Sequence, residues 1–192
     1  MKITPGDTSI EDDFGLTPVR LNSESNAEVV WARRIDPVRA RLTNIPFPDS
    51  GFRYGDIVLH DGAPVGYRTY NGSERAVFNV LQLFETSSFN TYEADILAPE
   101  PADVEALEKM CDQASFAMED WSHSVRILCK ACSEGRPHAH HDSPGKDEGW
   151  KVERRIAIAG VSDSQVEVVL NAWADAKRGV TAWRRTLAAS SK

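Results

Sequence analysis

Hydrophobic and polar residues follow two different periods along this chain, and the change of period divides it. From Ala27 to about Glu85, short segments rich in Val, Ile, Tyr and Phe are separated by Pro, Gly and Asn, as in strands joined by turns. The expected strands are EVVWA, VRARL, DIVLH, VGYRTY and RAVFNVLQLF. The pairs Asp61-Gly62 and Asn71-Gly72 favour positive φ and predict tight hairpins. Residues 27–88 are therefore expected to form a small antiparallel β module, either a sheet or a partial barrel.

After residue 89 the pattern mixes strands with two amphipathic helices. The first expected helix, at residues 103–118, places on one face Val104, Leu107, Cys111, Ala114 and Met118. A Ser-x-x-Gln capping box at Ser162 and Gln165 begins the second. Its apolar stripe is Val166, Val169, Leu170 and Trp173, and its C-terminal signals are Lys177, Arg178 and Gly179.

Four strands are expected around these helices: TYEADIL, HSVRILCKA, VERRIAIAG and VTAWRRTLA. The order β-α-β-β-α-β predicts a ferredoxin-like module over residues 89–192. The fold class is thus α+β, an antiparallel β module followed by a ferredoxin-like one. Residues 1–26 are rich in Thr, Ser, Asp, Glu, Gly and Pro without periodicity, so they are expected to form a flexible arm.

Charge and composition limit the kinds of partner. The 192 residues are 41% hydrophobic and carry a net charge of −7, which argues against non-specific binding to nucleic acids or anionic membranes. Nine acidic residues and the single base Lys109 lie between Glu93 and Asp120, whereas five basic residues and no acid follow Asp175. Solvated faces are the simpler interpretation, and a dipolar surface that selects a partner of matching sign is the alternative.

The location expected from the sequence is the cytoplasm. The N-terminal region carries Asp7, Glu11, Asp12 and Asp13 and lacks an apolar core segment, so it does not have the pattern of a signal peptide. The longest apolar stretch, VFNVLQLF, is too short to span a bilayer. Three cysteines are too few for a disulfide framework in a chain of this length.

A resemblance to a known family lies in the first module. Glu28 and Trp31 precede an Asn44-Ile45-Pro46-Phe47 turn, which is followed by Tyr54-Gly55-Asp56. In these features the chain resembles the bacterial domain of unknown function 4265 family, most specifically over residues 28–60 and more weakly to residue 80. The resemblance implies a fold and no mechanism. The topology expected for residues 91–188 is also similar to that of the regulator of ribonuclease activity B family, small proteins that bind and inhibit an enzyme.

The segment CKACSEGRPHAHHD contains the residues most suited to a metal. Cys129 and Cys132 have knuckle spacing, and zinc prefers four tetrahedral N or S ligands. In an extended segment His138 and His140 point to the same side, so these four residues are the expected ligands of one structural Zn²⁺. His141 would replace His140 in a helical turn. The metal would tether the long connection between two strands, residues 129–150.

The Cys/His cluster has three alternative interpretations. It could arise by chance, or the cysteines could be a redox pair, although such pairs usually open a helix. A catalytic zinc with Glu134 as base is possible chemically, but neither the deaminase signature nor His-Glu-x-x-His is present. Cys111 is expected in the core, and His60 and His123 at the surface or with satisfied hydrogen bonds.

No catalytic residues are predicted, and three functions compete. The first is a non-enzymatic, zinc-containing bacterial protein that binds another protein as a regulator or immunity factor, with the acidic helix at 103–120 facing a basic partner. The second is a zinc-dependent hydrolase that uses the Cys/His cluster. The third is a nucleic-acid-binding regulator that uses the basic C-terminal strand or the arginines of the first module, Arg33, Arg34, Arg39 and Arg41. The oligomeric state is not predicted.

Overall fold

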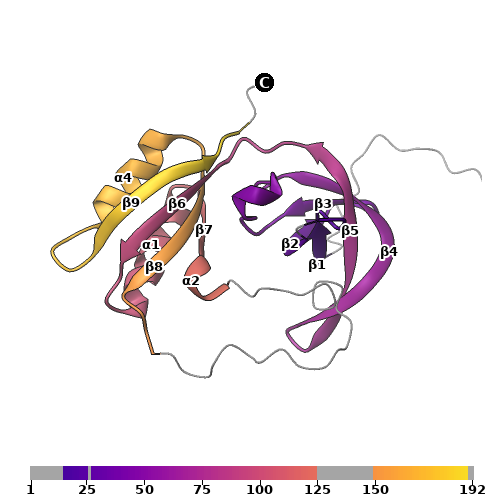
Figure 1. Ribbon diagram of the computed structural model, residues 1–192, viewed down its shortest axis with the longest axis horizontal. Coiled ribbons are helices and arrows are strands. Elements are labelled where there is room, and N and C mark those ends of the chain that lie inside the picture. Colours follow the sequence, from indigo (N-terminus) through magenta and orange to yellow (C-terminus); the bar gives the residue numbers. More distant parts are fainter. Residues whose placement is uncertain (1–14, 26, 125–148, 190–192) are drawn as a thin grey trace, which may run out of the picture.

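A computed structural model describes residues 15–25, 27–124 and 149–189, which form two β structures side by side (Figure 1). The first is a closed five-stranded barrel in the order β1-β2-β3-β4-β5. Its neighbouring strands are antiparallel, except that β1 closes the barrel by pairing parallel to β5. A 3-10 turn, η1 (Pro48–Ser50), lies between β3 and β4. The strands are β1 (Leu16–Leu21), β2 (Glu28–Arg34), β3 (Arg39–Leu42), β4 (Ile57–Tyr70) and β5 (Ser73–Glu85).

The second structure is a four-stranded antiparallel sheet in the order β7-β8-β6-β9. Helices α1 and α4 lie on the side of this sheet that faces away from the barrel (Figure 1). Strands and helices together make the protein α+β, as the sequence predicts. The elements are β6 (Asn90–Leu97), α1 (Pro101–Gln113), β7 (Ala117–Asp120), α2 (Trp121–Ser124), β8 (Glu153–Gly160), α4 (Asp163–Trp173) and β9 (Gly179–Leu187).

The flexible arm predicted for residues 1–26 is wrong for residues 16–21, which form β1. This strand pairs with β2 over its whole length, and Val19 and Leu21 are completely buried in the barrel core. Its sequence, LTPVRL, does not predict a strand, because polar and apolar residues do not alternate regularly in it. The polar residues Thr17 and Arg20 are nevertheless buried in the structure. Only the tertiary pairing reveals that the barrel begins before residue 27.

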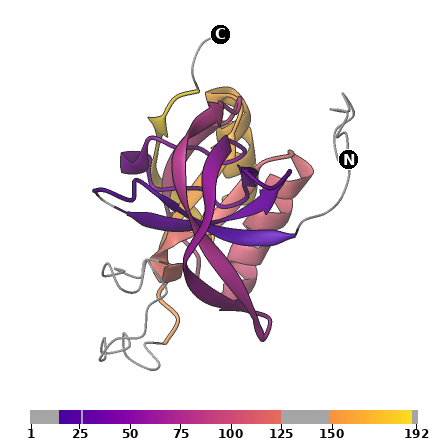
Figure 2. The ribbon, with the colours of Figure 1, turned by 90° about the vertical axis from the view of Figure 1, so that its right-hand side faces the viewer.

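One of the two predicted hairpin turns is correct. Asn71 and Gly72 have φ values of 48° and 73° and connect Tyr70 to its register partner Ser73, as a two-residue turn between β4 and β5 requires. Asp61-Gly62 is not a turn. Strand β4 continues through it, and the positive φ of Gly62 coincides with register shifts between His60 and Gly66. The resulting long β4–β5 hairpin projects beyond the other strands (Figure 2).

The predicted faces of both long helices are confirmed. Val104, Leu107 and Cys111 of α1 join the α4 stripe of Val166, Val169, Leu170 and Trp173 in one core with Tyr92 and other residues of the sheet. Ser162 caps α4 by accepting a hydrogen bond from the Gln165 backbone N–H at 3.4 Å. The helix ends at Trp173, before the predicted C-terminal signals, and Asp175 accepts hydrogen bonds from the Lys177 and Arg178 backbones in the following turn.

The region after α1 differs from the prediction. The helix ends at Gln113 and does not continue to Met118, because Ser115 adopts a φ of 61° and turns the chain into β7. The strand predicted at 123–131 therefore does not take the place beside β8, which belongs to residues 117–120. His123 and Ser124 are the last residues of α2, and residues 125–131 lie outside the described residues. No helix in the described ranges is long and apolar enough to cross a bilayer.

Candidate functional site

All five predicted zinc ligands lie outside the residues that the structure describes. These are Cys129, Cys132, His138, His140 and His141. Within residues 15–25, 27–124 and 149–189, no group of three or more His, Cys, Asp or Glu side chains is placed to hold a metal ion. The structural zinc site therefore stays a prediction.

Two further residues with metal-binding chemistry are buried. Cys111 is completely buried in the helical core, and burial, with smaller contributions from Asp112 and Glu108, raises the pKa of its thiol to about 12. His60 is inside the barrel at 2% exposure and stacks on Phe78 with a centroid distance of 4.8 Å. Burial, and then the charge of Arg34, lowers the pKa of His60, which favours the neutral imidazole. Both residues are thus parts of the core and not open ligands.

The turn Asn44–Phe47 joins the barrel to the sheet. Ile45 is 2% exposed and packs with Trp121 of α2 and with Ala157 and Ala159 of β8. Phe47 extends this contact, since the centroid of its ring lies 4.6 Å from the centroid of the Trp121 ring. The barrel therefore covers the face of the sheet opposite to the helices. The turn Asn44–Phe47 is thus the junction between the two β structures.

Two carboxylates hold the junction turn by its backbone. Glu28 of β2 accepts a hydrogen bond from the Phe47 backbone N–H at 3.1 Å. Glu119 of β7 accepts from the Ile45 backbone N–H at 2.8 Å and from the Asn44 side chain at 2.7 Å. Asn44 in turn accepts a hydrogen bond from the Trp31 backbone N–H at 2.7 Å. One carboxylate comes from each half, so the turn is clamped from both sides.

Burial dominates the protonation of both carboxyl groups. It raises the pKa of Glu28 to about 7, opposed by the Phe47 hydrogen bond and aided by the charge of Glu119. It also raises the pKa of Glu119, against the hydrogen bonds from Asn44 and Ile45. A pair of perturbed carboxyl groups is typical of acid–base sites, yet neither group lines the pocket described below. Their hydrogen bonds to the turn indicate a structural role.

A second connection ties the C-terminal segment and the linker to the barrel. The Arg53 guanidinium donates to the Ala188 carbonyl, with Nε at 2.9 Å. Asp56 is completely buried and accepts hydrogen bonds from the backbones of Arg53 at 2.8 Å and Ser87 at 2.7 Å. Burial raises the pKa of Asp56, against these hydrogen bonds. The linker between β5 and β6 is thereby held against the barrel.

A pocket of about 360 Å³ opens beside this linker. Its barrel wall is a row of three residues in register across β3, β4 and β5, namely Arg41, Ile57 and Glu85. The remaining lining residues come from the linker, from the C-terminal segment and from the turn before β4: Thr86, Ser87, Ser88, Phe89, Ala189 and Gly55. The volume falls in the range of small-molecule sites, roughly 300–1,000 Å³.

Four large apolar side chains on β5 and in the connection between β2 and β3 are exposed. Val38, Leu81, Leu83 and Phe84, called here the β5 strip, are 49%, 66%, 36% and 51% exposed. The Arg39 guanidinium lies over the Phe84 ring at 5.4 Å and forms an ion pair with Asp36 at 2.6 Å. Clusters of exposed apolar side chains on a folded protein mark interaction surfaces more often than scattered ones do.

The acidic and basic surfaces predicted from the sequence differ in how far their charges are paired in the structure. On α1, Glu105, Glu108 and Asp112 are exposed and spaced to share one helix face. Three of the five basic C-terminal residues are instead paired with acids of the same half, and Lys192 lies outside the described residues. Arg178 contacts Asp175 at 2.6 Å, Arg184 contacts Glu93 at 2.9 Å and Arg185 contacts Asp163 at 3.2 Å. A basic face for nucleic acid at the C-terminal strand is therefore largely neutralised.

Sequence patterns indicate neither the clamp nor the pocket. Glu119 is one of nine acids between Glu93 and Asp120, and nothing local distinguishes it from the exposed ones. Glu28 and the Asn44–Phe47 turn stand out in the sequence only through the family resemblance, which gives them no physical role. The signal that could have found the turn is its composition, since Ile, Pro and Phe around an Asn are unusually apolar for a surface connection.

Comparisons with known proteins add little information about these sites. No protein-family model matches the chain, and no curated protein matches it. Among solved structures, the crystal structure of a hypothetical protein from Neisseria gonorrhoeae is similar over 92% of this chain and 96% of that chain, at 14% sequence identity and a TM-score of 0.41. The candidate sites therefore rest on the residues of this chain.

Proposed function

We propose that this chain is a non-enzymatic binding protein, of regulatory or immunity type, whose protein partner docks on the β5 strip. The observation that carries the proposal is the exposure of Leu81, at 66%, together with Leu83 and Phe84 on one strand of a closed barrel. Strand β4 pairs with one edge of β5 along the strip, and β1 pairs with the other edge at Phe78 and Asn79. Apolar and aromatic side chains of this kind supply the centre of protein interfaces.

The arginines beside the strip favour a partner with acidic residues at the rim of its contact surface. Arg39 packs on Phe84, and Arg41 and Arg33 face each other in register on β3 and β2. Charges at the rim of an interface mainly raise the association rate and the selectivity for a partner of opposite sign.

Site-specific photo-crosslinking in the native cell tests the proposal. A photoreactive phenylalanine replaces Leu81 in one variant and Val168 of α4, an equally exposed apolar residue at 67%, in the other. We expect one discrete crosslinked protein from the first variant and none from the second. Arg39→Glu in the Leu81 variant should weaken that crosslink. Equal crosslinking at both positions, or none at Leu81, would contradict the assignment of the surface.

We also propose that residues 89–189 are a ferredoxin-like module and that the Cys/His segment binds one structural Zn²⁺. The strand order β7-β8-β6-β9, with α1 and α4 as the crossing helices, supports the first point. The chemistry of the donor set supports the second. Tag-free protein should carry about one zinc per chain by elemental analysis, and Cys132→Ser should lower this sharply while Cys111→Ala does not. Metal-free wild-type protein with unchanged stability on zinc addition would overturn the zinc proposal.

A further inference from the structure

The pocket beside the linker has an arrangement of charge that folding does not require. Arg41, Ile57 and Glu85 lie in one row on the outer side of the barrel, because their neighbours Ala40, Leu42 and Val58 fill its interior. Ile57 is nevertheless only 8% exposed, because it lies at the floor of a pocket whose other walls are the linker and the C-terminal segment. The row therefore forms an apolar floor with a cation at one end and an anion at the other.

The two charged side chains do not neutralise each other. Among the described residues, neither Arg41 nor Glu85 has an ion-pair partner within 4.0 Å, and both are exposed to solvent. One strand separates them, so their backbones are about 10 Å apart. Direct register partners such as Arg184 and Glu93 do pair, at 2.9 Å, but Arg41 and Glu85 have Ile57 between them. The gap over Ile57 thus leaves room for a ligand.

The walls of the pocket suit a ligand with both polar and apolar parts. Thr86, Ser87 and Ser88 contribute hydroxyl groups, whereas Phe89 contributes an aromatic ring. The Phe89 ring is held by an edge contact with Tyr54, with centroids 5.3 Å apart. The Ser87 backbone is fixed by its hydrogen bond to the buried Asp56. Both sides of the pocket are therefore anchored before any ligand arrives, which lowers the entropy cost of binding.

We propose that this pocket binds a small zwitterion with the charge separation of a dipeptide. Its carboxylate would contact the Arg41 guanidinium, its ammonium group the Glu85 carboxylate, and an apolar side chain the floor of Ile57 and Phe89. Two residues of extended chain span roughly 7 Å, which fits between two charged groups carried by backbones about 10 Å apart. A simple anion would be repelled by Glu85 and a simple cation by Arg41, so a molecule with both charges is preferred.

The test is a titration of the full chain with the dipeptide alanyl-leucine, followed by amide and side-chain NMR shifts. We expect saturable binding at millimolar concentration, because solvent-exposed charge contacts are individually weak. Shifts should be confined to residues 55–57, 85–89 and their neighbours. N-acetylated and C-amidated forms of the dipeptide, each lacking one charge, should bind about fivefold more weakly.

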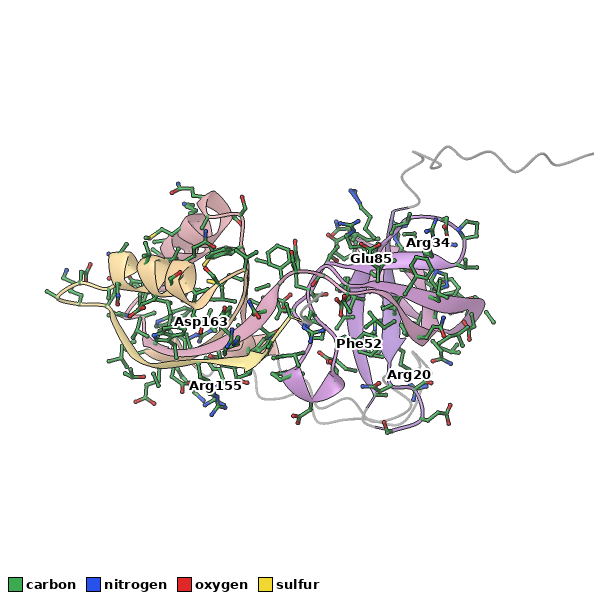
Figure 3. All side chains as sticks on the ribbon, turned by 90° about the horizontal axis from the view of Figure 1, so that it is seen from above. Arg20, Arg34, Phe52, Glu85, Arg155 and Asp163 are labelled. Atoms are coloured by element: carbon green, nitrogen blue, oxygen red, sulfur yellow. The ribbon has the colours of Figure 1, made fainter. Side chains whose placement is uncertain are left out.

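Variants separate this site from general charge effects. Arg41→Gln and Glu85→Gln should each weaken binding about fivefold with unchanged melting temperature, since both side chains are exposed. Arg155→Gln, a control on the sheet half and well away from Glu85, should bind like the wild type (Figure 3). The proposal is overturned if no saturable binding occurs, if the singly charged dipeptides bind equally well, or if Arg155→Gln weakens binding as much as Arg41→Gln.

This outcome is independent of the proposed docking surface. The photo-crosslink at Leu81 reports on a protein partner, whereas the titration uses a dipeptide and residues of the pocket. Failure of the titration leaves the docking proposal standing, and absence of a crosslink leaves the pocket proposal standing.

Discussion

The barrel and the sheet half bury their strands in different ways. In the sheet half, two amphipathic helices cover one face and share an apolar core with it, although Asn90, Thr91 and Arg154 are also buried in this half. The barrel instead closes on itself, with Thr17, Arg20 and His60 buried beside its apolar residues. The β5 strip is exposed on the barrel half, whereas exposed positions of the sheet half carry ion pairs such as Arg155–Asp95 at 2.9 Å.

This difference explains which half depends more on distant contacts. The helices are specified by residues three and four positions apart, so their stripes are visible in the sequence. Closure of the barrel depends on the parallel pairing of Val19 with Phe78 and Arg20 with Asn79, across nearly sixty positions. The barrel should therefore be the half that loses its structure when one terminal strand is removed, and the following experiments test that contrast.

Removal of β1 should have the largest effect. Deleting residues 1–22 leaves β2 and β5 with unpaired edges and removes Val19 and Leu21, which are both 0% exposed. We expect loss of cooperative unfolding of the barrel, measured by hydrogen exchange over residues 28–85. The point variant Leu21→Ala, which keeps the preceding residues, should cost about 2–5 kcal/mol. An unchanged melting temperature in both variants would show that the barrel does not need β1.

Leu170→Ala tests the helical core by the same quantity as Leu21→Ala, the loss of unfolding free energy. Leu170 is 1% exposed on the buried face of α4, so the variant should lose about 2–5 kcal/mol of unfolding free energy in urea titrations. Val168→Ala, two positions away and 67% exposed, is the matched control and should change stability by less than about 0.5 kcal/mol. Similar effects of the two substitutions would mean that the helix face is assigned wrongly.

Glu28→Gln should change how stability depends on pH. The pKa of Glu28 is raised in the folded state from 4.5 to about 7, so its contribution to stability is fully present below pH 4.5 and is lost as the pH rises through 7. Glutamine keeps an acceptor for the Phe47 N–H without the buried charge. The variant should therefore gain stability over the wild type at pH 8, on the order of 2 kcal/mol, and show little gain at pH 4.5.

Urea titrations of both proteins at the two pH values measure this difference. Because Asp56 and Glu119 also have raised pKa values, the wild type alone would not isolate Glu28, and the difference between variant and wild type does. A variant that is less stable than the wild type at pH 8 would show that the ionised carboxylate strengthens the junction and does not strain it.

The smallest expected effect is at the β4–β5 turn. Gly72 has a φ of 73°, a conformation that costs an L-residue about 1 kcal/mol, although a Cβ there would meet no atom within 4 Å. Gly72→Ala should lower the unfolding free energy by about that amount. Gly149→Ala, also without neighbours within 4 Å, is the control and should be neutral. Equal effects would contradict a turn that depends on positive φ.

Much of the fold could be predicted from local pattern, and the misses occur where pairing between strands decides the structure. The helix stripes around Leu107 and Leu170 and the Asn71-Gly72 turn follow from spacing and from φ preferences. Asp61-Gly62 shows the same preference and yet lies within a strand, because β4 pairs with β5 on both sides of it. The positive φ of a glycine can serve a bulge as well as a turn, and the sequence alone does not distinguish them.

By itself, the sequence determined the α+β class, the buried faces of the two long helices and most of the strands, because these depend on neighbours within a few positions. Tertiary structure alone decided that Leu16–Leu21 closes a barrel and that Glu28 and Glu119 clamp one turn from opposite halves. It also decided that Arg41 and Glu85 stand at the two ends of one row. Register and closure bring together residues tens of positions apart, and no local period encodes that meeting.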